Sequence, residues 1–415
     1  MIQHLPAELI EKIFLYAYPL VRIHDDLGQG STWTLEQVCV QWHSIATSYK
    51  RLWSTMDIDV ERSRFKRSQT TNNLLLCLQR TGNHPLSVLL HDAPGANSRS
   101  WMAIVDILIP HCHRWRTFTC HFPLQYFTES YREEAKGQLS ALKQLNIVAE
   151  KNYARVPIFA PSAMFKDTPS LLHLSIDGLY GFRRLNLPWT QLQEISLENI
   201  QYVARSRFWE GLKIVGPTLK KLSLRKIIFG STPYILMASP SERVIQFTMM
   251  YELSIAQCES MNSILQDISC PQLRSLALQL DEVSTSIIPL SDFLHRSHCR
   301  LDQLYLKSHP FLSLPQVLAL PQVANIAQLA LEFQGTFTSE NSLREMVSLV
   351  QSVILPSARL VDQVSGTLRF LEFTIRSSPS RWEDEWVVDC MRDLRDFCVS
   401  RGVKVALHNL PEYGA

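Results

Sequence analysis

Most of the chain repeats one arrangement of apolar and polar positions, Leu-x-x-Leu-x-Leu, with other apolar residues allowed at the three anchors. Nine copies begin at positions 142, 171, 192, 219, 250, 273, 301, 326 and 368, and a weaker copy, WRTFTC, begins at Trp115. The last part of each copy alternates apolar and polar residues, which is the period of a strand with one buried face. Spacings of 21 to 42 residues between copies predict a solenoid, in which each unit buries its apolar side against its neighbours.

Several segments between the copies have the apolar spacing of helices. SRSWMAIVDILI (98–109) and SLREMVSLVQ (342–351) each place apolar residues three or four positions apart. The segment 380–407 predicts a long helix that stops at Gly402 and is followed by a last strand, which together would cap the repeat. We therefore expect an α/β solenoid of parallel strands and helices over residues 57–415.

The repeat resembles that of leucine-rich-repeat proteins, but it is irregular. The ninth position of the standard repeat is Asn or Cys, whose side chain bonds to backbone groups at the turn. Among the nine copies only Cys258 follows this rule, so the sequence does not specify the turn chemistry.

The first 56 residues have a different pattern, which predicts two or three short helices. The first has the apolar stripe Leu9, Ile10, Ile13, Phe14 and Ala17, and Pro19 ends it. Residues 22–31 are polar and contain glycine, which predicts a loop. Thr34 with Gln37 fits a capping box, Trp33 and Val38 fit a hydrophobic staple, and the apolar face of the second helix consists of Leu35, Val38, Cys39, Trp42, Ile45 and Ala46. So small a unit has a thin core and would gain from a partner or from packing on the rest of the chain.

Composition narrows the class of protein. Lys and Arg number 41 against 39 Asp and Glu, which gives no basic footprint for nucleic acid. No apolar run approaches 18 residues, so we expect no membrane span, and the start lacks the pattern of a signal peptide. Nine scattered cysteines without a CxxC pair favour a reducing compartment, cytoplasmic or nuclear.

Catalytic and metal motifs are scarce. His111, Cys112, His113, Cys120 and His121 could suggest zinc, but a closed site needs four ligands in tetrahedral reach, and ordinary packing between a helix and a strand is the preferred interpretation. The sequence has no G-x-S-x-G, P-loop or Rossmann glycine pattern. We therefore expect no enzyme, no metal and no cofactor.

The N-terminal region resembles the F-box, in particular that of fungal proteins. The outline runs from Leu-Pro near the start through an apolar helix with Ile-Phe to Val-Cys, a Trp and a final Leu-Trp. The residues that match this outline, and that the resemblance implies as contacts for a partner, are Leu5, Pro6, Leu9, Ile13, Phe14, Val38, Cys39, Trp42, Leu52 and Trp53.

The resemblance implies a small all-α F-box over residues 1–56 that binds a Skp1-like linker protein and, through it, a cullin. The remainder, residues 57–415, would hold a protein substrate for an SCF-type ubiquitin ligase. The alternative is a stand-alone leucine-rich-repeat scaffold in which the N-terminal helices only cap the solenoid.

Substrate contacts are expected on the outward strand positions, which line the concave face of such a solenoid. In the copies these positions mix both signs of charge with small residues, so neither a phosphate-reading nor a nucleic-acid surface is predicted. The best candidates for contacts with a protein substrate are Arg225, Tyr305 and Lys307.

Overall fold

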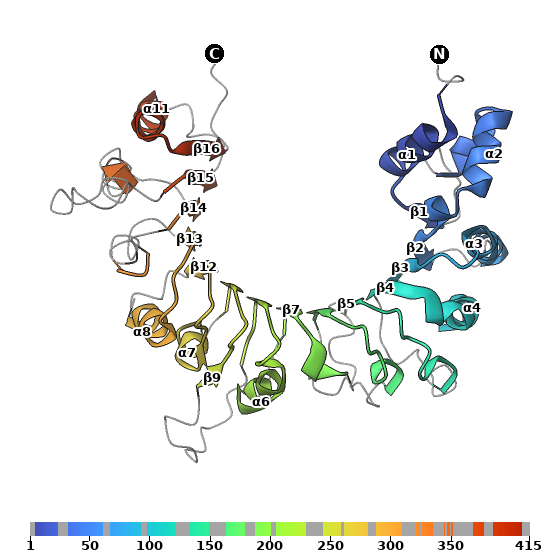
Figure 1. Ribbon diagram of the computed structural model, residues 1–415, viewed down its shortest axis with the longest axis horizontal. Coiled ribbons are helices and arrows are strands. Elements are labelled where there is room, and N and C mark those ends of the chain that lie inside the picture. The colour runs from blue at the N-terminus through green and yellow to red at the C-terminus, as the bar shows by residue number, and fades with distance from the viewer. Residues whose placement is uncertain are drawn as a thin grey trace. The chain divides into compact units, whose positions relative to one another are not determined.

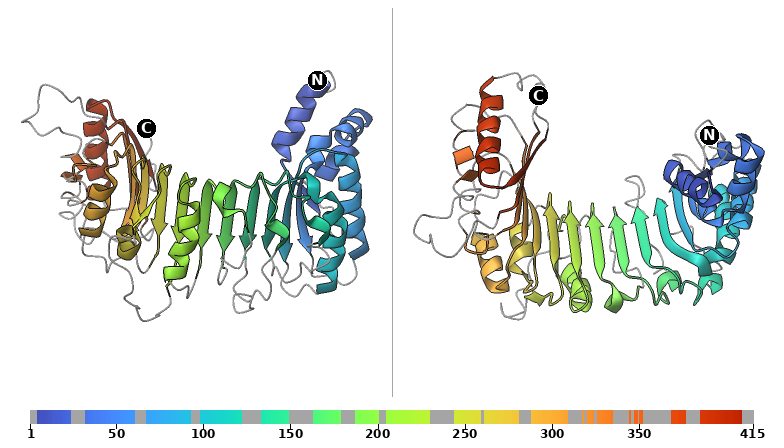
Figure 2. Two further views of the ribbon diagram at one scale, coloured as in Figure 1. Left: turned by 60° about the horizontal axis from the view of Figure 1, so that its bottom comes forward. Right: turned by 45° about the horizontal axis from the view of Figure 1, so that its top comes forward.

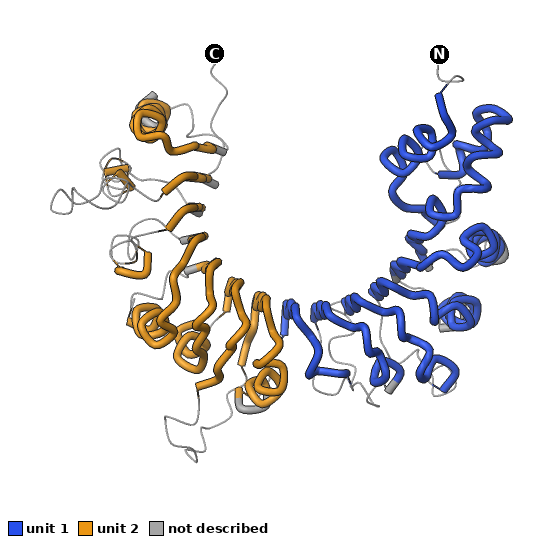
Figure 3. Tube along the Cα trace, in the orientation of Figure 1, with its two compact units in different colours: residues 1–203 blue, residues 204–415 orange. Residues whose placement is uncertain are grey.

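A computed structural model of the chain describes most of its residues. The described ranges are 5–23, 32–60, 67–92, 98–121, 133–148, 163–178, 187–200, 205–229, 244–258, 261–280, 288–308, 317, 320–323, 326–334, 344, 347–348, 350–351, 368–376 and 385–408. The chain divides into two compact units, unit 1 over Met1–Val203 and unit 2 over Ala204–Ala415 (Figure 3).

Unit 1 is a parallel sheet whose strands lie side by side in chain order. The strands are β1 (Val21–Ile23), β2 (Thr55–Val60), β3 (Leu86–Asp92), β4 (Trp115–His121), β5 (Gln144–Val148), β6 (His173–Asp177) and β7 (Glu194–Glu198). The helical elements are α1 (Ala7–Ala17), η2 (Thr32–Gln37), α2 (Val40–Ser48), η3 (Lys50–Trp53), α3 (Arg67–Thr81), α4 (Ser98–Leu108), η4 (Ile109–Arg114), η7 (Ala163–Phe165) and η9 (Trp189–Gln191), where η marks a 3-10 helix. Figure 1 shows α3 and α4 together on one side of the strands that they connect.

Unit 2 follows the same plan. Its strands β8 (Lys221–Arg225), β10 (Glu252–Ala256), β12 (Ser275–Leu280), β13 (Gln303–Ser308), β14 (Gln328–Gln334), β15 (Phe370–Arg376) and β16 (Lys404–His408) pair in that order, and every pair is parallel. A separate two-stranded pair joins β9 (Ile245–Gln246) to β11 (Ile268–Ser269). The helices are α6 (Arg205–Val215), α7 (Met261–Gln266), α8 (Ile288–Ser297) and α11 (Glu385–Ser400), and Figure 2 shows them beside the strands.

The repeat seen in the sequence is confirmed as a series of strands. Each of the nine copies produces a strand that begins two residues after its first anchor, and the weaker copy produces β4. Five second anchors of the copies are all at most 2% exposed, namely Leu174 in unit 1 and Leu222, Leu276, Leu304 and Leu329 in unit 2. Parallel register stacks equivalent anchors in neighbouring strands, as where Leu276 pairs with Leu304 and Leu304 with Leu329, so within each unit the anchors form an apolar layer.

The turn after four of the strands depends on backbone geometry, and at Cys258 the side chain also takes part, since its Sγ donates to Ala256 O at 3.4 Å. Gly178, Asn199, Lys226 and Gln257 each directly follow a strand and have φ between 51° and 79°, a region that is strained for residues other than glycine. The N–H of Lys226 donates to Ala256 O at 2.9 Å. The ninth positions that the structure describes in these copies are buried: Ile200, Ile227 and Cys258.

The predicted cap at Thr34 is wrong. The chain forms 3-10 helix η2 over Thr32–Gln37 and starts the α-helix only at Val40, after the N-cap Cys39. Thr32 is fully buried and its hydroxyl donates to Leu20 O at 3.3 Å. With this hydrogen bond to Leu20, the helical segment begins at Thr32, before the cap that the local pattern predicts. Val38 is exposed and does not form the expected staple with Trp33.

The N-terminal region is not entirely helical. Val21–Ile23, of which Arg22 and Ile23 were expected in a loop, form strand β1 and pair with β2. Strand β2 spans the expected boundary between residues 56 and 57 and pairs on its other side with β3. The N-terminal region is therefore hydrogen-bonded into the sheet of unit 1 through β1 and β2. The expected division at 56/57 between an F-box and a solenoid stays a prediction.

The expected helix at 98–109 is confirmed as α4, and the C-terminal helix, glycine stop and strand are confirmed as α11, Gly402 and β16. The described residues of the segment 344–351 are helical. The apolar pattern alone therefore located these elements.

Candidate functional site

Helix α1 presents an apolar stripe to solvent. Leu9, Ile13 and Tyr16 are 45%, 47% and 93% exposed, and their spacing of four and three residues places them on one face of the helix. Ile10 and Phe14 lie on another face and are buried. One side of the helix is therefore packed, whereas another offers apolar side chains to water.

Two more apolar side chains are exposed at the start of α2: Val38, just before the N-cap, and Val40, the first residue of the helix, at 58% and 88%. Between them Cys39 caps α2, since its Sγ accepts a hydrogen bond from the backbone N–H of Trp42 at 3.5 Å. The rings of Phe14 and Trp42 meet edge to face with centroids 4.9 Å apart, which packs α1 against α2. We call these five exposed residues the N-terminal apolar surface: Leu9, Ile13, Tyr16, Val38 and Val40.

The residues that the F-box outline singled out fall into three groups. Three are buried inside unit 1: Phe14, Leu52 and Trp53. Three are partly exposed: Leu5, Cys39 and Trp42. Four are exposed: Pro6, Leu9, Ile13 and Val38. A protein that docks on this region can touch the second and third groups, whereas the buried group holds the helices in position.

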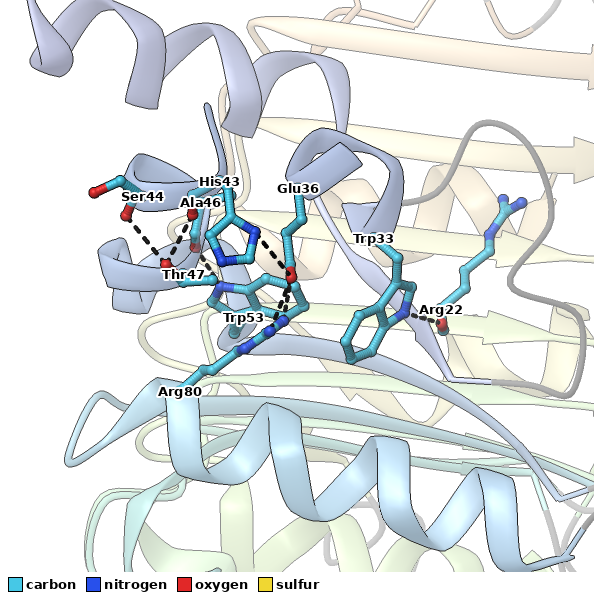
Figure 4. Close-up of polar contacts among 9 residues, drawn as sticks. All are labelled: Arg22, Trp33, Glu36, His43, Ser44, Ala46, Thr47, Trp53 and Arg80. Carbon is cyan, nitrogen blue, oxygen red and sulfur yellow. Dashed lines mark hydrogen bonds and ion pairs between the residues drawn. The ribbon is translucent and has the colours of Figure 1, made fainter. Parts of the chain in front are cut away.

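A cationic side chain from α3 joins the N-terminal helices to the repeat (Figure 4). The guanidinium of Arg80 lies 4.2 Å from the centroid of the Trp53 ring and 5.3 Å from that of Trp33. It forms a bidentate ion pair with Glu36, in which Nη1 donates to Oε1 and Nη2 donates to Oε2 at 2.9 Å. Both charged side chains are mostly buried, 14% and 13% exposed.

The two indole N–H groups of this cluster are also satisfied. Nε1 of Trp53 donates to Ala46 O at 2.6 Å, and Nε1 of Trp33 donates to Arg22 O at 3.4 Å (Figure 4). The tryptophan centroids are 4.9 Å apart. These tryptophans therefore serve the internal packing of unit 1, and the exposed apolar side chains of this region are the smaller ones on α1 and at the start of α2.

Two of the three expected substrate contacts in unit 2 are engaged with a neighbouring strand. Nζ of Lys307 pairs with Glu332 Oε1 at 2.6 Å, and the hydroxyl of Tyr305 donates to the other carboxylate oxygen of Glu332. Glu332 is only 6% exposed. Arg225, at the end of β8, is exposed. Tyr305 and Lys307 thus form a polar cluster with Glu332 on the strand face.

The outward side chains of β2–β7 form a second candidate surface in unit 1. They occupy three positions on each strand, alternate with buried anchors and are all partly exposed. We call this set the polar face of unit 1: Thr55, Asp57, Asp59, Ser87, Leu89, His91, Thr117, Thr119, His121, Gln144, Asn146, Val148, His173, Ser175, Asp177, Glu194, Ser196 and Glu198.

Two histidines lie side by side within the polar face. Nε2 of His91 is 3.1 Å from Asp57 Oδ1, and the rings of His91 and His121 have centroids 4.4 Å apart. Burial lowers the pKa of His121, and His91 lowers it further, whereas Asp177 and Asp57 oppose this shift. Because burial is the larger cause, the neutral form of His121 is favoured in the folded chain.

The cysteines are not arranged for chemistry. All nine are free, and all but Cys39 are buried. Burial raises the pKa of the thiols of Cys77, Cys120 and Cys270, and it raises that of Cys112, Cys299 and Cys398 to about 11. A buried thiol with a raised pKa is a poor nucleophile. Among the described residues, no group of three or more His, Cys, Asp or Glu side chains could hold a metal ion.

Comparison with known proteins gives no match, either to a protein-family model or to a curated protein sequence. In the part of the chain that the structure describes, no helix has the length and apolar character needed to cross a membrane.

Sequence reasoning missed several residues of these surfaces. Tyr16 and Val40 were absent from the expected contacts because the F-box outline, from which those contacts were taken, includes neither residue. Arg80 and Glu36 are polar residues 44 positions apart, and no local pattern links them. The polar face was partly visible in the sequence, since the alternation in the copies already identifies the outward positions of β5, β6 and β7.

Proposed function

We propose that this protein is the substrate-recognition adaptor of an SCF-type cullin ubiquitin ligase. In this proposal the N-terminal region is an F-box that binds a Skp1-like linker protein, and the strand repeat is an irregular leucine-rich-repeat solenoid that holds a protein substrate. The adaptor itself carries no catalytic residue, and ubiquitin transfer is performed by other subunits.

The N-terminal apolar surface is the observation that carries this proposal. Leu9, Ile13 and Val38 belong to the F-box outline and are all about half exposed or more. They lie on or beside α1 and α2, which pack together through the rings of Phe14 and Trp42. Arg80, over the ring of Trp53, joins this region to α3. Exposed apolar side chains on a well-supported scaffold are characteristic of protein interaction sites. Removing them from water on binding supplies the driving force for association.

Calorimetric titration of the full chain with a purified Skp1-like linker protein tests the proposal. Ile13→Asp and Val38→Asp place a charge at the centre of the expected interface without touching the core, so each should weaken binding by at least about thirtyfold, as for central anchor residues. Leu5→Ala combined with Pro6→Ala should weaken it more than tenfold. The matched control is Val399→Asp, which introduces the same charge at an apolar residue of α11 that is 63% exposed, and it should bind as the wild type does.

Absence of measurable binding by the wild type would reject the adaptor function and favour the stand-alone scaffold. Equal affinities for Ile13→Asp, Val38→Asp and Val399→Asp would show that the linker protein binds elsewhere, and they would reject this surface as its docking site.

A further inference from the structure

Two exposed residues of the N-terminal apolar surface lie on a short connection. Val38 directly follows η2 and Val40 begins α2, with the N-cap Cys39 between them. A 3-10 helix has hydrogen bonds of poorer geometry than an α-helix, so the six residues of η2 depend on contacts with the rest of unit 1. Those contacts therefore decide where the two valines lie.

Side chains of three residues hold η2 in place. The hydroxyl of Thr32 and the indole N–H of Trp33 donate to backbone carbonyls in or next to β1, at 3.3 and 3.4 Å. Glu36 forms the bidentate ion pair with Arg80, and both charged side chains are mostly buried. Charge-assisted bidentate pairs are stronger and more directional than hydrogen bonds between neutral groups. Because Glu36 lies two residues before Val38, the strongest of these contacts is also the nearest to the exposed valines.

Arg80 also supports α2. Its guanidinium lies 4.2 Å from the centroid of the Trp53 ring, and Nε1 of Trp53 donates to Ala46 O of α2 at 2.6 Å (Figure 4). Trp53 itself is fully buried. One side chain of α3 is therefore linked to η2 through Glu36 and to α2 through Trp53, on the two sides of the short connection.

Helix α1 is attached by different contacts. The rings of Phe14 and Trp42 meet edge to face with centroids 4.9 Å apart, and Ile10 is buried as well. Arg80 contacts η2 and η3 instead. A change at Arg80 should therefore affect the two valines more than it affects Leu9 on the exposed side of α1.

We propose that Arg80 is a positioning residue for linker binding. It contacts Glu36 and Trp53, and it thereby holds η2 and α2 in the arrangement that presents the two valines to the linker protein. This inference rests on the proposed function and adds to its site a residue that lies outside the F-box outline, on the first helix of the repeat. When only a fraction of the chains has the segment in place, the apparent dissociation constant rises by the inverse of that fraction.

Thiol labelling of the full chain without linker protein tests the positioning step by itself. Cys39 is the one cysteine among nine that is not buried, so a brief maleimide reaction followed by mass spectrometry reports on this segment. We expect Arg80→Met to be labelled at Cys39 at least about fivefold faster, since local opening exposes the thiol. Arg80→Lys keeps a cation beside Glu36 and Trp53 and should stay within about twofold of the wild type. The matched control is Arg392→Met, at an exposed ion pair of α11, and it should be labelled as the wild type is.

Calorimetric titration with the linker protein tests the consequence for binding. Arg80→Met should weaken binding by about tenfold, and Arg80→Lys should recover most of this loss. A double-mutant cycle separates positioning from a general loss of stability. Val38→Ala should cost less affinity in the Arg80→Met chain than in the wild type, because the valine is no longer held in place, whereas Leu9→Ala should cost the same in both. A urea unfolding curve of each variant checks that the fold is retained.

Equal labelling rates at Cys39 in Arg80→Met and Arg392→Met would overturn the inference. Wild-type affinity of Arg80→Met for the linker protein would also overturn it, as would equal coupling of Val38 and Leu9 to Arg80. A wild type that does not bind the linker protein would reject the proposed function, and with it the role of Arg80 in binding, whatever the labelling rates. Binding by the wild type therefore distinguishes the two failures.

Discussion

The contacts of Arg80 with Glu36, Trp33 and Trp53 predict that this one side chain of α3 controls the free energy of local opening of the N-terminal helices. Arg80→Met keeps an apolar chain against Trp33 and Trp53 but removes the charge and both hydrogen bonds to Glu36. Glu36 then stays mostly buried, 13% exposed, and its nearest remaining cationic candidate is His43, whose Nδ1 is 3.9 Å away and whose side chain is 56% exposed.

The magnitude follows from the burial of the pair. Removing one partner of a fully buried ion pair costs about 3–5 kcal/mol, whereas an exposed pair contributes about 0–1 kcal/mol. With side chains that are 14% and 13% exposed, Arg80 and Glu36 lie between these two limits, so breaking the pair should cost about 2 kcal/mol. Loss of the cation over the Trp53 ring adds about 0.5–2 kcal/mol, part of which the methionine restores by packing. We expect a total cost of about 2–3 kcal/mol.

Hydrogen–deuterium exchange is the suitable assay, because it reports local opening of η2 and α2 separately from the rest of a long repeat protein. A cost of about 2–3 kcal/mol corresponds to about 30-fold to about 150-fold faster exchange in α2. The amides of unit 2, for example in β12, should exchange as in the wild type.

Two comparisons make the result specific. Glu36→Gln combined with Arg80→Met should cost less than the sum of the single changes, since each single change leaves one buried charge without its partner and the double variant leaves none. The same substitution at an exposed pair, Arg392→Met beside Asp389 at 2.8 Å, should cost under about 0.5 kcal/mol. Exchange in α2 that is no faster in Arg80→Met than in Arg392→Met would refute this reasoning.

Four further results are expected from equilibrium urea unfolding. Leu276→Ala should cost about 2–5 kcal/mol, because its side chain is 1% exposed between two stacked anchors, and a value under 1 kcal/mol would contradict the stacked core. Lys226→Gly should stabilise the fold by about 0.5–1 kcal/mol, because glycine adopts a φ of 51° without strain. Gly178→Ala should destabilise the fold, because alanine is strained at a φ of 79°. Changes of the same sign in the free energy of unfolding would be inconsistent with this turn. Burial lowers the pKa of His121, so the unfolded chain binds the proton more tightly and stability should fall as the pH drops below about 6.5, less so in His121→Gln; an unchanged profile would exclude this residue as a source. Arg114→Met should cost about 2–3 kcal/mol, since the buried guanidinium donates to Thr81 Oγ1 at 3.1 Å and to carbonyls at the end of α3, and a neutral result would mean that water satisfies those carbonyls.

The strands of the repeat could be predicted because their signal is local. An anchor such as Leu304 is recognised from its immediate neighbours, and the alternation of a strand follows directly from the pleat. The start of each of the nine strands that follow the nine copies was therefore correct to the residue, whereas β1, β2 and β3 lie outside the copies. Helices α4 and α11 followed from a helical period over more than two turns.

The N-terminal details could not be predicted because their causes are distant in the sequence. Thr32 is fixed by Leu20, Trp33 by Arg22, and Glu36 by Arg80. These contacts outweigh the local capping pattern at Thr34. The exposure of Leu9 and Ile13 also required the structure, since an apolar stripe on a helix is wider than the face that packing buries.

The turn after the strands has a consequence for the length of the chain between them. Left-handed residues directly follow four of the described strands, and at Lys226 the next residue, Ile227, is buried, so these strands end through local backbone geometry. The connections are consequently free to differ, and they do: the copies that begin at Leu171 and Leu192 are 21 residues apart, whereas those at Ile326 and Leu368 are 42 apart. Sequence inserted into such a connection leaves strand register intact, because loop closure costs only about 0.6 kcal/mol for each doubling of length. Diversity among related chains should therefore accumulate as loop insertions, and a tag placed within residues 335–343 should leave the paired strands β14 and β15 in register.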